Sequence, residues 1–102
     1  MQMTEIVNIK PYSKVENRQF DVCEIVISKK DFKKEDYKSN RITFVFENCD
    51  FNKVIVKNSE IIDFKDISIR FKYSLVRDIQ IEEIKSTNFI IIFQFDSHRK
   101  YK

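Results

Sequence analysis

The apolar residues of this chain of 102 residues are almost all strand formers. The sequence holds sixteen Ile, ten Phe and eight Val, against one Leu and no Ala. β-Branched and aromatic side chains favour strands, whereas Ala and Leu are the best apolar helix formers. The charged fraction of 34% is that of a globular chain. These counts predict a single β-rich domain over residues 1–96, followed by a basic tail at 97–102.

Alternation of apolar and polar residues locates the strands. Positions 67–75 alternate cleanly, as in a strand with one buried face, and Ile79 and Ile81 after the break at 76–78 predict its hairpin partner. A change of phase at Val22 and Cys23 predicts a β-bulge. Ser28 and the charged residues after it predict at most one short helix, near 29–38. The sequence therefore predicts an all-β fold: a single antiparallel sheet curled into a small barrel or sandwich.

A second pattern leaves an alternative fold open. Apolar residues recur at every fifth position with one failure, at Phe46, Phe51, Val56, Ile61, Phe71, Val76 and Ile81. The segment Glu47-Asn48-Cys49-Asp50-Phe51 resembles a single unit of the pentapeptide-repeat family, in which a small residue lies two positions before a central Phe or Leu. The resemblance covers that unit alone. It implies a short β-solenoid, and no site or activity is inferred from it.

Two segments are apolar on both faces, at 42–46 and at 89–95. Such strands need cover on both sides, and the chain offers at most one short helix to supply it. Either the sheet closes on itself or a second protein covers it. We therefore expect a protein partner, with a homodimer as one form of it.

The absence of glycine excludes several classes of enzyme. Phosphate-binding loops, dinucleotide-binding turns and the nucleophile elbow of hydrolases all depend on glycines that this chain lacks. Lack of Gly and Ala together with many Lys, Asn and Ile also indicates an AT-rich bacterial genome, or a phage or mobile element of such a host.

Catalytic and metal-binding residues are equally scarce. The single His, His98, lies in the basic tail, and with Cys23 and Cys49 it makes no ligand-like spacing. Two cysteines do not form a disulfide framework, and buried reduced thiols are favoured, with their pairing left open. We predict no enzyme, no cofactor and no metal. Without a signal peptide or a long apolar run at 1–96, we expect a cytoplasmic protein with no membrane partner.

The net charge of +3 is modest and its excess is local. It resides in the segment 29–41 and in the tail. The basic residues proposed for binding are Arg70, Lys72, Lys53, Lys57, Arg99 and Lys100. They would suit a binder of single-stranded nucleic acid built on a small β-barrel, but the acids among them would repel phosphate.

Protein binding fits the remaining observations better. A small β domain without catalytic groups acts by its surface, through a strand edge or a sheet face. We predict a non-enzymatic protein-binding module, an inhibitor of a host or rival enzyme in bacteria, of the phage anti-defence or the toxin-immunity and antitoxin type. The alternative is the nucleic-acid binder.

Overall fold

The computed structural model describes residues 2–38, 41–58, 66–84 and 90–96. Its strands are β1 (Thr4–Asn8), β2 (Lys14–Glu16), β3 (Gln19–Val26), β4 (Arg41–Glu47), β5 (Asp50–Asn58), β6 (Asp66–Lys72), β7 (Leu75–Val76), β8 (Ile79–Ile84) and β9 (Ile90–Asp96). No helix in these ranges is long and apolar enough to span a membrane.

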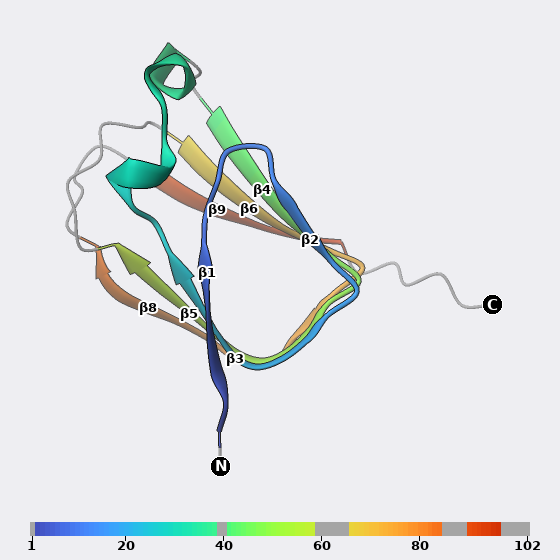
Figure 1. The fold of residues 1–102 in the computed structure, drawn as a ribbon. Coiled ribbons are helices and arrows are strands. Elements are labelled where there is room, and N and C mark those ends of the chain that lie inside the picture. The colour runs from blue at the N-terminus through green and yellow to red at the C-terminus, as the bar shows by residue number, and fades with distance from the viewer. Residues whose placement is uncertain (1, 39–40, 59–65, 85–89, 97–102) are drawn as a thin grey trace.

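The strands form two sheets in which every pair is parallel. Sheet 1 has the order β1-β3-β5-β7, with β8 also paired to β5, and sheet 2 has the order β2-β4-β6-β9. The chain alternates between the sheets. We call one passage of the chain through sheet 1 and then sheet 2 a coil, so that each coil adds strands to both sheets. In Figure 1 the connections that lead from sheet 2 back to sheet 1 run side by side.

The prediction of a single antiparallel sheet is therefore wrong, and there is no closed barrel. Ile79 and Ile81 are not in a hairpin with β6. The chain turns a corner after β6, enters sheet 1, and pairs β8 in parallel with β5. Local alternation had identified the buried face of β6 correctly, but the strand predicted at 67–75 ends at Lys72, and Leu75 is exposed on β7. Alternation also carries no information on which distant strand lies alongside.

The alternative fold, a solenoid, requires coils stacked in parallel, and the strands of this chain do pair in parallel from coil to coil. The repeat of the structure, however, is not five residues long. Phe46 pairs with Phe71, 25 positions later, and Val56 pairs with Ile81 at the same spacing. The recurrence at every fifth position includes these register pairs and a third, Phe51 with Val76. Within a strand the buried residues alternate instead, as Ile42, Phe44 and Phe46 do.

Two local predictions also need correction. The phase change at Val22 is a bend, because Phe20 pairs with Phe51 and Val22 with Lys53 at one constant offset, with no bulge between them. The expected short helix near 29–38 is two 3-10 turns, η1 (Lys29–Asp31) and η2 (Lys34–Lys38). They lie in the connection between β3 and β4.

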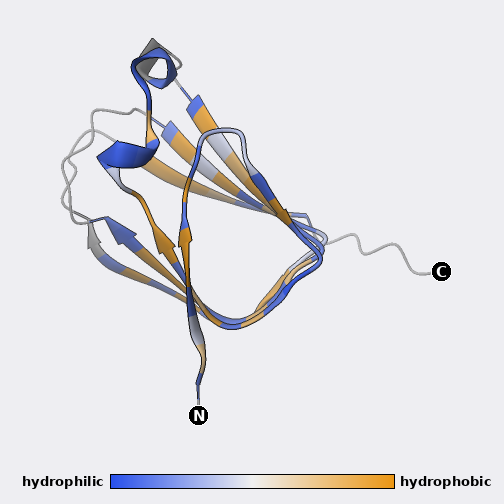
Figure 2. Cartoon of the chain, viewed as in Figure 1, coloured by the Kyte–Doolittle hydropathy of each residue, from blue (hydrophilic) through white to orange (hydrophobic). Residues whose placement is uncertain are grey.

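The core lies between the two sheets and is richest in phenylalanine at the corner where they meet. Phe46 stacks on Phe71 with ring centroids 5.4 Å apart, and Phe20 stacks on Phe51 at 4.9 Å. The two stacks meet edge to face, with 5.1 Å between the centroids of Phe46 and Phe51. Figure 2 shows hydrophobic and hydrophilic residues alternating along the strands of both sheets.

Candidate functional site

The corner between the sheets is built on left-handed residues. Asn17, Asn48 and Tyr73 each follow a sheet 2 strand and have φ between 53° and 58°. Asn tolerates this conformation better than other residues that carry a β-carbon. The Asn48 side-chain amide donates a hydrogen bond of 2.8 Å to the Asn17 amide oxygen, which joins two coils. A chain without glycine thus turns its corners mainly with asparagine.

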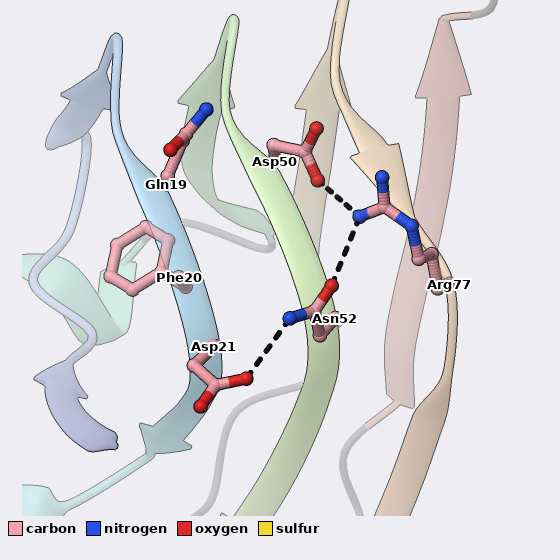
Figure 3. Close-up of a pocket in the computed structure, with 6 residues that line it drawn as sticks. All are labelled: Gln19, Phe20, Asp21, Asp50, Asn52 and Arg77. Atoms are coloured by element: carbon pink, nitrogen blue, oxygen red, sulfur yellow. Dashed lines mark hydrogen bonds and ion pairs between the residues drawn. The ribbon is translucent and has the colours of Figure 1, made fainter. Parts of the chain in front are cut away.

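A hollow of about 360 Å³ lies just beyond this corner, lined by side chains of three successive coils. Its lining residues are Gln19, Phe20, Asp21, Asp50, Asn52 and Arg77. Figure 3 shows four of them, Asp21, Asn52, Arg77 and Asp50, joined across the coils. The Asn52 amide donates to Asp21 at 2.9 Å, and Arg77 donates to the Asn52 amide oxygen at 3.3 Å and to Asp50.

The chemistry of this hollow is structural. The hydrogen bonds from the Asn52 side chain and from the Met3 backbone N–H lower the pKa of Asp21, because they stabilise its charged form. A carboxylate whose pKa is lowered is a poor general base near neutral pH. Asp50 is already ion-paired to Arg77. The side chains of the hollow therefore bind one another across the coils.

The cysteines are equally unreactive by position. Cys23 and Cys49 are free and buried, and burial raises the pKa of Cys23 to about 12 and also raises that of Cys49. A thiol is nucleophilic only as thiolate. In the described ranges no three His, Cys, Asp or Glu residues come together as metal ligands would.

The four basic residues proposed for binding that the structure describes are divided between the two sheets and are ion-paired. Arg70 and Lys72 lie on β6, where Arg70 contacts Asp96 at 2.8 Å and Lys72 contacts Glu47 at 3.7 Å.

The other basic candidates fall on sheet 1 or beyond the described ranges. Lys53 lies 3.9 Å from Asp78, and Lys57 is paired with Glu24 and with Glu82, whose hydrogen bonds and charges raise the pKa of Lys57. Arg99 and Lys100 lie outside the described residues, as does the tail that carries them. The four described positions do not form one basic patch.

The most exposed part of the apolar core is the last coil, formed by β7, β8 and β9. Ile81 and Phe95 continue the buried lines of Val56 and Phe71, yet they are 53% and 51% exposed. Leu75 is also exposed, and Val76, Ile79, Ile91 and Phe93 are only partly buried. No described strand pairs with the free edges of β8 and β9. We call this surface the open end.

From the sequence we expected strands with two apolar faces to be covered either by a sheet closed on itself or by a second protein. In the structure the exposed apolar side chains of the interior lie on the last coil. The residues of the open end were assigned to strands but not singled out as a site. The signal that could have found them is the coil spacing itself, because it aligns Ile81 with Val56 and Phe95 with Phe71. No family model matches this chain, and neither a curated protein nor a solved structure does.

Proposed function

We propose that this chain is a non-enzymatic protein-binding module, an inhibitor of a bacterial enzyme of the phage anti-defence or toxin-immunity type, and that it binds its target with the open end. The observation that carries the proposal is the exposure of core-type side chains along two unpaired strand edges. Contiguous apolar surface of this kind is typical of interaction sites. A strand of the target would extend one of these edges, with backbone hydrogen bonds providing affinity and apolar pockets providing selectivity.

Inhibition would follow because the bound module occupies a surface that the target enzyme needs. A rigid stack of coils that pairs with a strand edge of an enzyme blocks whatever that edge or its neighbouring cleft must contact. The ion pairs on the four described basic candidates favour this function over nucleic-acid binding, because a phosphate backbone would have to compete with bound carboxylates.

The test uses a matched pair of variants. Ile81→Lys places a charge on the open end, whereas Ile6→Lys places the same charge on β1, where Ile6 is already 65% exposed and points away from the core. Tagged protein is used to capture partners from a lysate of an AT-rich bacterium, and the sample is divided into one half treated with nuclease and one half left untreated.

We expect a specific protein to be retained by wild type and by Ile6→Lys, and to be lost with Ile81→Lys. Retention by all three proteins would contradict the open end as the binding surface. Recovery of nucleic acid, with every protein lost on digestion, would overturn the proposal in favour of the nucleic-acid binder.

A further inference from the structure

The two ends of the stack of coils differ in their protection. At the first coil, β2 has only three residues, and its Lys14 is ion-paired with Glu16 at 3.1 Å and with Glu47 at 3.5 Å. Arg18 is paired with Glu5 and lies over the Phe20 ring, 4.6 Å from its centroid. Short edge strands and charged side chains are the devices by which proteins prevent strand addition. The first coil has both.

The last coil also holds a short strand, β7 (Leu75–Val76), and ion-paired acids, but its other two strands are longer. Its edge strands, β8 and β9, are six and seven residues long, so they are closely matched in length. Apolar side chains are exposed on both strands, Ile81 on one and Phe95 on the other. A terminal coil with its apolar interior exposed normally requires a cap. In the described fold, the open end is therefore the end at which long strand edges and apolar interior side chains are available to pair with another strand.

Charge at the open end is already balanced within the chain. The acids with described side chains on the last coil are Asp78, Glu82 and Asp96. Each is paired with a base of the preceding coil: Lys53, Lys57 and Arg70, respectively. A partner therefore needs no complementary charge, and two identical ends can approach each other without opposing unpaired charges. This neutrality favours an apolar partner with edges of the same length.

The area is sufficient for a stable contact. The described last coil, residues 73–84 and 90–96, follows an edge of about 60 Å at about 3.3 Å per residue. A strip about 10 Å wide along this edge covers about 600 Å² on each copy, or about 1,200 Å² in total. Specific interfaces begin at about this size.

We propose that a second copy of this chain covers the open end when no target is bound. The two copies are related by a two-fold axis, so that the last coil of one copy contacts the last coil of the other. Self-association excludes target binding because the second copy and the target use the same strand edges. This inference rests on the proposed function in that it names a competitor for the same surface. Because a two-fold contact uses the same surface on both copies, the assembly closes at two copies and does not grow into a fibre.

The test is the mass in solution by light scattering, from low to high micromolar protein. Wild type and Ile6→Lys should reach twice the chain mass of 12.4 kDa. Ile81→Lys should raise the dissociation constant at least about 100-fold, because each copy brings one unpaired charge to the contact. Phe95→Asp should do the same from the other edge strand. Circular dichroism and urea unfolding check that each variant folds.

Wild type alone also tests the proposal. A dimer held by apolar edges should persist at high salt, whereas a dimer that salt dissolves would overturn the proposal. A monomer at every concentration, a dimer insensitive to Ile81→Lys and Phe95→Asp in their folded forms, or open-ended assemblies would overturn it as well. A monomer that still loses its captured protein with Ile81→Lys would overturn self-association alone and support the proposed function. A dimer whose captured material is only nucleic acid would support self-association and overturn the proposed function.

Discussion

Tyr73 occupies a corner position where the two preceding coils have asparagine. Its φ of 53° costs more for an aromatic residue than for Asn. We expect Tyr73→Asn to stabilise the fold by about 0.5–1 kcal/mol, and Tyr73→Ala, which removes the same ring without adding an amide, to give no gain. Urea unfolding measures both. A Tyr73→Asn variant less stable than Tyr73→Ala would show that the ring, which Lys72 approaches to 5.4 Å, matters more than the backbone.

The buried thiols give a second expectation. Because burial raises the pKa of Cys23 to about 12 and also raises that of Cys49, both remain protonated near pH 8. We expect neither to react with an aromatic disulfide reagent in the native protein and both to react in urea. The control is Leu75→Cys, an exposed position whose thiol should react at once. Rapid labelling of native Cys23 or Cys49 would contradict the assigned burial.

Asp21 links one hydrogen-bonded side chain to the pH dependence of stability. Its pKa is lowered in the folded state, first by Asn52 and then by the Met3 backbone N–H. The stabilisation is therefore complete above the ordinary carboxyl pKa of about 4 and is lost as pH falls through the lower folded-state pKa. We expect the free-energy difference between wild type and Asp21→Asn to shrink from pH 7 to pH 3 in urea unfolding. A difference that stays constant would contradict this linkage.

At the scale of residues the sequence was informative about type and less so about position. It favoured buried reduced thiols at Cys23 and Cys49, which the structure has. It did not identify the ion pairs of Arg70 or Lys57, because their partners lie 26 and 33 positions away in sequence. Pairings of that kind depend on the register of the coils, which local patterns do not contain.

At the scale of elements, the phenylalanine stack shows how position within the fold sets the energetic weight of a side chain. Phe71 and Phe95 are neighbours in one stack, with centroids 5.1 Å apart, but Phe71 is fully buried and Phe95 is half exposed. We expect Phe71→Ala to cost about 3–5 kcal/mol, and Phe95→Ala about 1 kcal/mol in dilute solution. Urea unfolding of the two variants decides this, and equal losses would contradict an open last coil.

The parallel arrangement was missed because its signal lies at a distance of a whole coil. The segment Val15-Glu16-Asn17 is followed by Phe20, and the segment Phe46-Glu47-Asn48 is followed at the same spacing by Phe51. These two segments are register partners in the structure. Searching for recurrence over 20 to 50 residues would have found them.

The absence of glycine was a further signal against hairpins. The tight two-residue turns that join antiparallel strands need positive φ at one or both central residues, which glycine accepts most easily. Each of the three described turns from sheet 2 to sheet 1 uses one such residue, and asparagine provides it at two of them. The same composition that excluded phosphate-binding loops therefore also favoured a coil over a meander.

At the scale of the whole molecule, the direction of stacking defines one protected end and one open end. The first coil is closed by short strands and ion pairs, while the last coil exposes Ile81 and Phe95 between edges that no described strand covers. Target binding and self-association are both assigned to this open end. Its chemistry is apolar and neutral, so affinity should depend on contact area and backbone pairing rather than on salt.

The most direct measurement is amide hydrogen exchange of the wild-type chain at low and high protein concentration. Strand addition at the open end protects backbone N–H groups of β8 and β9 that no described strand satisfies. We expect exchange in these two strands to slow as concentration rises, while exchange in β1 and β2 stays the same. Slowing confined to β1 and β2, or exchange that concentration does not change in any strand, would contradict the open end as a protein-binding surface.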